Sequence, residues 1–328
     1  MRRFLSLLCA LTLTLSLAGC AGRMPTEDDG RLHVVTTLFP YYDFARAIAL
    51  DRAEVTLLLS PGREAHSFEP TPLDAVTISR ADLFVYNGGE GEVWVDDMLS
   101  AVGEDIGSVL CMMDCVDARE EEFSEGMQGA HDHAHDDHDD HDHDHDTHDS
   151  DEIEYDEHIW TSPVNAMALC RAIADALAAA DAENADFYRE NAEAYCAQLA
   201  ALDEELRTLR QSAARTTLIF ADRFPLLYFC EEYDLDYRAA FHGCSSDTEP
   251  SLATLKFLID KVREEEIPVI YTIDLSSRKV AEVVSECTGA RIERLWSMQT
   301  VSRADFDAGE TYLSLMQRNI DALKAGLL

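Results

Sequence analysis

The chain has 328 residues, 47% of them hydrophobic, and a formal net charge of −38 at pH 7. This acidity excludes nucleic-acid binding, which needs a basic surface, and it excludes adhesion to anionic lipid by charge. A cationic ligand is the natural complement of such a surface. The length suits two lobes of ordinary domain size, each able to bury its own core.

The N-terminus predicts export. Residues 1–19 carry two arginines, then an apolar run too short to anchor in a bilayer, so we expect a signal peptide. The run Leu17-Ala18-Gly19-Cys20 resembles the lipobox of bacterial lipoproteins, in which Cys20 becomes the acylated first residue of the mature chain. An ordinary signal peptide with an incidental cysteine is the alternative. Residues 20–30 then form a short lipidated tether.

Apolar runs rich in β-branched residues alternate with helical patterns along the rest of the chain. Strands are predicted at 32–37, 55–59, 83–86, 108–111, 216–220, 237–241, 269–273 and 291–295. Helices are predicted to start at Thr71-Pro72, Ser162-Pro163 and Ser276-Ser277, where a hydroxyl can cap the first turn, and Gly289 ends one helix. This alternation predicts an α/β fold with two doubly wound parallel sheets.

One long segment, residues 184–212, interrupts the alternation because it contains no glycine or proline and is rich in alanine, leucine, glutamate and arginine. As a helix it would be about 45 Å long, enough to run along both lobes as a rigid connection. We therefore expect an N-terminal lobe over 31–183, a linking helix over 184–213 and a C-terminal lobe over 214–328.

Residues 120–157 have no sustained apolar period and are dominated by Asp, Glu and His, which predicts a mobile loop inside the first lobe. Eight histidines stand in this loop: His131, His133, His135, His138, His141, His143, His145 and His148. Imidazole is a favoured ligand for zinc, copper and nickel. An expression tag would not be internal, and an acidic linker would explain only the aspartates. Because ordering such a loop costs entropy, we expect it to collect several weakly bound ions.

Four candidate ligands for a tighter site fall next to predicted strand ends or helix starts, where open α/β sheets bind ligands. His66 follows a strand, His158 precedes the helix capped by Ser162, and two aspartates, Asp222 and Asp274, follow strands of the second half. Taken singly, a loop histidine is often a surface group and such an aspartate often caps a helix. Convergence of all four on one crevice is the functional hypothesis.

Seven cysteines remain beyond Cys9 and Cys20. The spacing of Cys111 and Cys115, with no second pair to close a four-sulfur cage, is weak evidence for a metal site. We interpret these cysteines as small buried apolar residues, with a disulfide as the alternative.

Several motifs together carry a family resemblance. The lipobox, PGREAHSFEP at 61–70, the His-rich acidic loop, DEHIWTSP at 156–163 and the long central helix resemble the zinc-binding solute-binding lipoproteins of ABC transporters. This family of rigid-helix metal receptors also includes manganese-binding relatives. The resemblance implies a monomer, anchored by lipid at the extracytoplasmic face of the bacterial cell membrane, that binds one metal ion in a cleft between its lobes. It also implies delivery of that ion to an ABC transporter permease.

The resemblance implies the ligands as well. His66 and His158 match the first two histidines of the family, and Asp274 matches its acidic fourth ligand. Ala221 stands where a third histidine is common, so Asp222 or His242 would have to replace it, and a water molecule could complete the shell.

Two histidines with a carboxylate suit Zn²⁺, whereas manganese and iron prefer more oxygen ligands. A manganese or iron receptor of the same fold is therefore one alternative, and a surface lipoprotein that buffers metal through the loop alone is another. An enzyme is not expected, because the sequence has no HExxH, GxSxG, P-loop or dinucleotide-binding motif.

Overall fold

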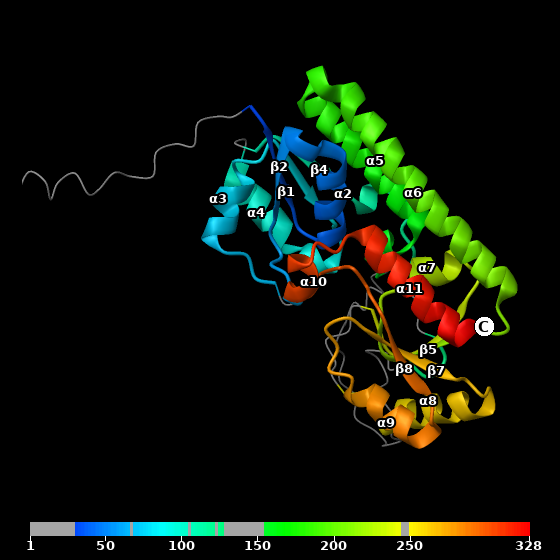
Figure 1. The fold of residues 1–328 in the computed structure, drawn as a ribbon. Helices are drawn as coiled ribbons and strands as arrows, with labels where there is room; N and C mark the ends of the chain where they lie inside the picture. The colour runs from blue at the N-terminus through cyan, green and yellow to red at the C-terminus, as the bar shows by residue number, and fades with distance from the viewer. Residues whose placement is uncertain (1–29, 66–67, 104–105, 122–123, 128–153, 244–248) are drawn as a thin grey trace, which may run out of the picture. The chain divides into compact units, whose positions relative to one another are not determined.

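The computed structural model describes residues 30–65, 68–103, 106–121, 124–127, 154–243 and 249–328 (Figure 1). The predicted signal peptide, Cys20, His66 and the eight histidines of the loop lie outside the described residues. The contacts divide the chain into residues 1–31 and 32–328.

The first sheet has four parallel strands in the order β2-β1-β3-β4. These are β1 (Leu32–Thr36), β2 (Ala53–Leu57), β3 (Leu83–Tyr86) and β4 (Ser108–Cys111). Side chains of α2 (Phe39–Ala49) and α5 (Pro163–Ala180) are buried with one face of the sheet, and α3 (Pro72–Ile78) and α4 (Trp94–Val102) contribute to a separate cluster with the other. We call these elements the N-terminal lobe.

The second sheet repeats this arrangement in the order β6-β5-β7-β8, again all parallel. Its strands are β5 (Thr217–Phe224), β6 (Asp236–His242), β7 (Val269–Ile273) and β8 (Arg291–Leu295). Side chains of α8 (Leu252–Glu264) and α9 (Lys279–Thr288) form a separate core with one face. Together with α7 (Leu227–Glu232) these elements are the C-terminal lobe. The short helix α10 (Arg303–Asp307) and the final helix α11 (Tyr312–Leu327) follow.

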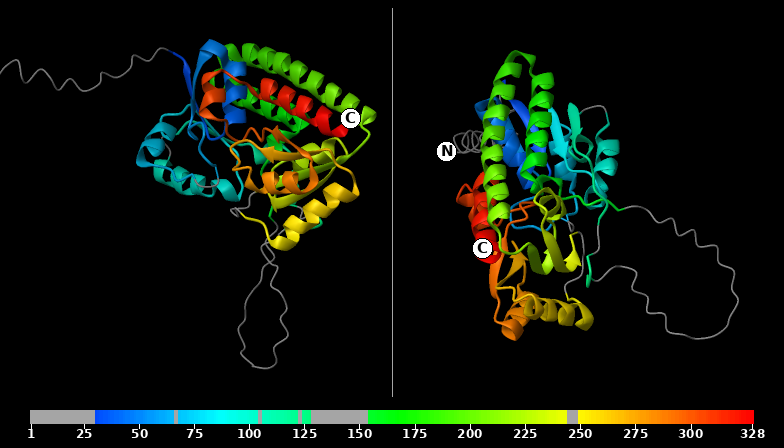
Figure 2. Two further views of the ribbon diagram at one scale, coloured as in Figure 1. Left: turned by 60° about the horizontal axis from the view of Figure 1, so that its bottom comes forward. Right: turned by 90° about the vertical axis from the view of Figure 1, so that its right-hand side faces the viewer.

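The long helix α6 (Ala185–Ser212) lies beside α5 in every view of Figures 1 and 2. The pairs Arg171–Glu193 and Asp175–Arg189 join the two helices and show that they run antiparallel. One buried core contains Phe44 of α2, Leu199 of α6 and Phe220 of β5, so apolar packing is continuous from one lobe to the other. A shared core of this kind opposes wide hinge opening between the lobes.

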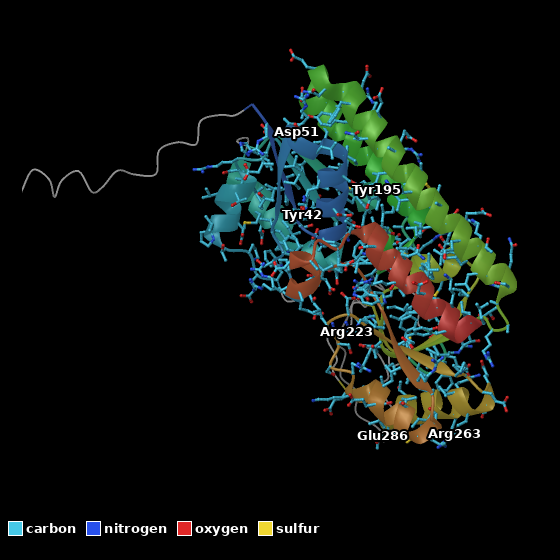
Figure 3. The ribbon with its side chains drawn as sticks, viewed as in Figure 1. Tyr42, Asp51, Tyr195, Arg223, Arg263 and Glu286 are labelled. Carbon is cyan, nitrogen blue, oxygen red and sulfur yellow. The ribbon has the colours of Figure 1, made fainter. Side chains whose placement is uncertain are left out.

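A buried carboxylate also ties α6 to its neighbours. The Tyr195 hydroxyl of α6, labelled in Figure 3, donates to Oδ2 of Asp43 in α2 at 2.8 Å. The backbone N–H of Tyr312, at the start of α11, donates to the same oxygen at 2.9 Å. The final helix is therefore fixed to the N-terminal lobe as well as packed against β8.

The predicted fold class is confirmed: two parallel α/β sheets with a long helix between them, and each of the eight predicted strands is present in the described residues. Thr71 and Ser162 cap α3 and α5 through their hydroxyls as expected, and Gly289 ends α9 with φ 82°. The predicted start of α9 at Ser276-Ser277 is wrong. The helix begins at Lys279, because Arg278 adopts φ 60° and its N–H donates to the Ser276 hydroxyl instead.

A second difference concerns Asp222, which the sequence predicts to follow its strand. Strand β5 instead continues to Phe224, and its register with β6 shifts between Phe220 and Arg223. Such an irregularity re-aims the side chains of the bulged residues. Asp222 therefore lies within the strand, at its irregular point.

The ends of the predicted loop 120–157 lie side by side. Glu120 pairs with Tyr155 in an antiparallel bridge, the Glu121 N–H donates to Glu154 at 2.8 Å, and the Asp156 N–H donates to Arg119 at 2.9 Å. The Tyr228 hydroxyl of α7 accepts from the Arg119 N–H and donates to the Asp156 carbonyl. The base of the loop is thus paired with itself and fixed to α7 of the C-terminal lobe.

The six cysteines that the structure describes are all free, and Cys170, Cys196 and Cys230 are buried. Their packing among apolar side chains agrees with the first interpretation for these three, whereas Cys111 and Cys115 are half-buried and Cys287 is exposed, so the interpretation is wrong for Cys287. Cys111 and Cys115 are not joined by a disulfide. Of the described helices, Pro163–Ala180 is long and apolar enough to cross a membrane, but its buried side chains belong to the shared core.

Candidate metal centre

Asp222 and Asp274 line one cavity of about 240 Å³ at the carboxyl ends of β5 and β7. The two strands are neighbours, and the Ile273 N–H donates to Oδ2 of Asp222 at 3.3 Å. Glu64 and Ala65 of the N-terminal lobe also line this cavity. His66 itself lies outside the described residues, but the residue before it is part of the wall.

Asp274 holds one carboxylate oxygen in a hydrogen bond and the other in none. Oδ1 accepts from the Ser297 N–H at 2.7 Å, whereas Oδ2 is buried and has no partner among the described residues. Burial raises the pKa of Asp274 to about 6, against the lowering effect of the Ser297 hydrogen bonds. A buried polar atom without a partner is costly. A cation in the cavity would satisfy this oxygen.

Asp222 is more fully partnered. Its Oδ1 accepts from the backbone N–H of Arg223 at 2.9 Å. Burial raises the pKa of Asp222, although hydrogen bonds, including one from Ser276, act to lower it. The guanidinium of Arg223, labelled in Figure 3, forms an ion pair with Glu64 of the N-terminal lobe. This pair joins the segment that precedes His66 to the strand that carries Asp222.

His158 is buried, with 1% of its surface exposed, immediately before the turn that leads into α5. Its N–H donates to Oδ1 of Asp156 at 2.8 Å, and its ring Nδ1 lies 3.2 Å from the same oxygen. Burial lowers the pKa of His158, but the charge and hydrogen bond of Asp156, with nearby glutamates, outweigh it and raise the pKa. When Nδ1 donates to this carboxylate, Nε2 carries the lone pair, which is how metal-binding histidines are commonly oriented.

A short path connects His158 to Asp274. The ring of Trp160 meets the His158 ring edge-on at 5.5 Å between centroids, and its indole N–H donates to the Ser297 carbonyl at 2.8 Å. Ser297 in turn donates its N–H to Asp274. Trp160 and Ser297 therefore connect, through one ring contact and two hydrogen bonds, the candidate histidine of the N-terminal lobe to the candidate aspartate of the C-terminal lobe.

His242 ends β6 and is not among the residues that line the cavity. Its Nδ1 lies 3.0 Å from Oε1 of Glu121, a side chain that is 5% exposed at the base of the loop. Gly243 lies against the His158 ring, since a Cβ at this glycine would stand 2.8 Å from Cε1. The residue after His242 therefore contacts the His158 ring, while the His242 side chain pairs with Glu121.

The structure thus brings Asp222 and Asp274 together at one cavity, whereas His158 and His242 are not among the residues that line it. No three His, Cys, Asp or Glu side chains among the described residues form a group that could hold a metal ion, and His66 is not one of those residues. The full ligand set stays a prediction.

Sequence reasoning missed several residues of this region. Asp156 could have been found, because a carboxylate two residues before a candidate ligand is well placed to orient its imidazole. Ser297, Glu121 and the pair Arg223–Glu64 left no local signal, since each acts on a partner that is distant along the chain.

Comparisons with known proteins agree with the resemblance drawn from the motifs. A family model described as "Zinc-uptake complex component A periplasmic", ZnuA, matches residues 34–326. The zinc-binding lipoprotein AdcA of Streptococcus pneumoniae serotype 4 is 32% identical over 98% of this chain, which spans 60% of the length of that relative. The high-affinity zinc uptake system protein ZnuA of Bacillus subtilis is 32% identical over 91% of this chain and 88% of its own length.

Solved structures give the same result. The metal-dependent lipoprotein YcdH from Bacillus subtilis has a TM-score of 0.73 and 31% identity, covering 91% of this chain and 100% of its own. The Zn(II)-bound ZnuA-like domain of Streptococcus pneumoniae AdcA has a TM-score of 0.72 and 28% identity, covering 91% and 99%. The family match covers nearly all of the two lobes and the helix between them. This chain belongs to the family of zinc-uptake complex component A periplasmic proteins, the ZnuA family.

Proposed function

We propose that this chain is an extracytoplasmic receptor that captures Zn²⁺ and delivers it to the permease of an ABC transporter for uptake. Its family and relatives are solute-binding receptors and not enzymes. The observation that carries the proposal is Asp274, which lines a cavity beside Asp222 and whose buried Oδ2 has no partner among the described residues, in a member of this family. The zinc named in the relatives' descriptions is the cation that fits.

The proposed ligands are His66, His158 and Asp274, with Asp222 or His242 as a further one. Ala65 in the cavity wall supports His66, and the path through Trp160 and Ser297 supports His158. Asp222 is supported by the cavity it shares with Asp274, and His242 by its nearness to His158. Two imidazoles and one or two carboxylates match the tetrahedral sites that Zn²⁺ prefers.

A manganese or iron receptor of the same fold is the second candidate, and the shared cavity of two carboxylates favours it. If both Asp222 and Asp274 bind the ion, oxygen makes up half or more of the shell, which moves selectivity toward these metals.

The rest of the chain would place this receptor at the membrane. Residues 1–19 act as a signal peptide, Cys20 carries lipid, and 20–30 tether a monomeric receptor to the extracytoplasmic face of the bacterial cell membrane. The His-rich loop collects ions at low affinity for the tighter site. Residues 31–183, 184–213 and 214–328 are the proposed limits of the lobes and linking helix.

Deleting residues 130–148 separates the receptor from a metal buffer. Native mass spectrometry with zinc should show one tightly bound ion for each chain after the deletion, and manganese added in competition should not displace it. Loss of nearly all binding would instead support the surface buffer, and displacement by manganese would support the second candidate. In the same background His66→Ala should abolish the tight site, and unchanged affinity would rule out His66 as a ligand.

A further inference from the structure

Glu157 is a buried carboxylate that the proposed ligand set does not use. It directly precedes His158 and is 3% exposed. Its Oε1 accepts from the Gly91 N–H at 2.7 Å. Burying a carboxylate is costly unless hydrogen bonds compensate for the lost water, so this contact indicates that the side chain has a defined place.

The turn after β3 is shaped to receive this side chain. Gly88 and Gly89 adopt φ 92° and 82°, in the left-handed region that favours glycine. A Cβ at Gly89 would stand 2.6 Å from Oε1 of Glu157 and 2.7 Å from its Cγ, so a larger residue would collide with it. Successive backbone N–H groups of the turn point at the carboxylate, an arrangement that binds anions.

The backbone of Glu157 is held by the same turn. The side-chain amide of Asn87 donates to the Glu157 carbonyl at 3.1 Å, and the Tyr41 hydroxyl of α2 donates to Oδ1 of Asn87. Main chain and side chain are thus both fixed within the N-terminal lobe. None of these contacts involves the C-terminal lobe.

We propose that Glu157 is a positioning residue, which docks the segment bearing His158 onto the Gly88–Gly91 turn and so preorganises the imidazole for metal. The inference rests on the proposed function, in which His158 binds the ion. Asp156 fixes the rotation of the ring, and Glu157 fixes the backbone from which the ring projects. A ligand already held in place loses less conformational freedom when the metal binds.

The test uses the protein lacking residues 130–148, so that the tight site is measured alone. Glu157→Ala removes the docking contact, Glu157→Gln keeps an acceptor oxygen of the same reach, and Glu90→Gln is the matched control. Glu90 is an exposed acid in the same turn, so this control removes one charge without touching the contact. The measurements are zinc affinity against a chromogenic chelator, the visible spectrum with Co²⁺ bound, and amide exchange of Gly91 without metal.

Glu157→Ala should weaken zinc binding about tenfold or more, change the intensity of the Co²⁺ bands at saturation, and speed Gly91 exchange. Glu157→Gln should stay within about threefold of the parent, and Glu90→Gln should match it. The inference is wrong if Glu157→Ala keeps the parent's affinity and Co²⁺ spectrum, or if its Gly91 amide stays protected.

Should Glu157→Ala fail to fold, Glu157→Asp tests the same contact, because it keeps the charge but falls one methylene short of Gly91. Equal zinc affinity and Gly91 protection in Glu157→Asp would then overturn the inference. Failure of the proposed function looks different: His158→Ala would bind zinc as tightly as the parent. Gly91 exchange in the metal-free protein would still decide whether Glu157 docks its segment.

Discussion

His158 of the N-terminal lobe and Asp274 of the C-terminal lobe differ in how their side chains are held in the absence of metal. The histidine is held by Asp156 and its neighbour by the Gly88–Gly91 turn, whereas Asp274 leaves one buried oxygen without a partner among the described residues. His158 would favour metal binding because its side chain is already fixed and loses little conformational entropy when the metal binds. Asp274 would favour metal binding because a cation would compensate the cost of burying its carboxylate oxygen.

The largest effect should come from Asp274→Asn, which places an amide nitrogen at the position of Oδ2 and keeps the oxygen that accepts from Ser297. Zinc affinity should fall about a thousandfold, roughly 4 kcal/mol, because a buried charge partner is lost. Stability without metal should be equal or higher, because one buried acid is removed. Competition titration and urea unfolding measure the two quantities. Parent-like zinc affinity would remove Asp274 from the ligand set.

The pH dependence of stability should show that a buried carboxylate near Glu157 has an electrostatic cost. Glu92, which directly follows the Gly88–Gly91 turn, is buried, and burial raises its pKa to about 7. Between pH 4.5 and 7 the folded state therefore keeps the proton that the unfolded state releases. Stability without metal should therefore fall as pH rises from about 4.5 to 7, by roughly 3 kcal/mol in total. In Glu92→Gln this contribution should vanish, and urea unfolding at pH 5 and 7.5 measures it. An unchanged pH dependence would show that Glu92 is charged throughout.

Asp156→Asn should show how much the hydrogen bond from His158 to Asp156 contributes to zinc binding. The amide can no longer accept with full charge from Nδ1 of His158, so the ring loses orientation and basicity, and zinc affinity should fall about tenfold. Isothermal competition titration with the loop removed measures this loss. If affinity changes less than twofold, the backbone contacts alone hold the ligand.

The smallest effect is expected from the ion pair between the lobes. Arg223→Ala should speed zinc release by about two- to fivefold, because a partly exposed pair contributes no more than about 1 kcal/mol. Stopped-flow mixing with excess chelator measures the release rate. The charge exchange Arg223→Glu with Glu64→Arg should restore the parent rate, and a double variant as fast as Arg223→Ala would contradict a direct contact.

Local pattern was enough for most of the fold. Strands β3, β4, β7 and β8 begin and end where the sequence predicts, because each is a short apolar run between turn residues. The pattern failed at Arg278, where a left-handed conformation delays the start of α9, and at Asp222, where an irregular strand keeps the residue inside β5. Both failures come from backbone geometry that composition does not encode.

The candidate site was predictable only as a list of residues. The sequence places Asp274 and His158 next to a strand end and a helix start, which is where such sheets bind ligands. It could not indicate that Oδ2 of Asp274 has no partner within the described part of the chain, or that the Glu157 carboxylate accepts from Gly91, because both depend on residues brought together by folding. Grouping of the candidates is a property of the tertiary structure.

The hydrogen bond between Glu121 and Glu154 holds the two ends of the intervening segment together. Glu125 pairs with Arg238 and Gly126 lies against Phe257, so the segment is held as far as residue 127, and its far end pairs at Glu154. The entropic cost of closing a chain grows logarithmically, so doubling its length costs only about 0.6 kcal/mol. Changes of chain length between residues 128 and 153 should therefore cost little folding free energy, and the number of histidines there can vary at a similarly small cost.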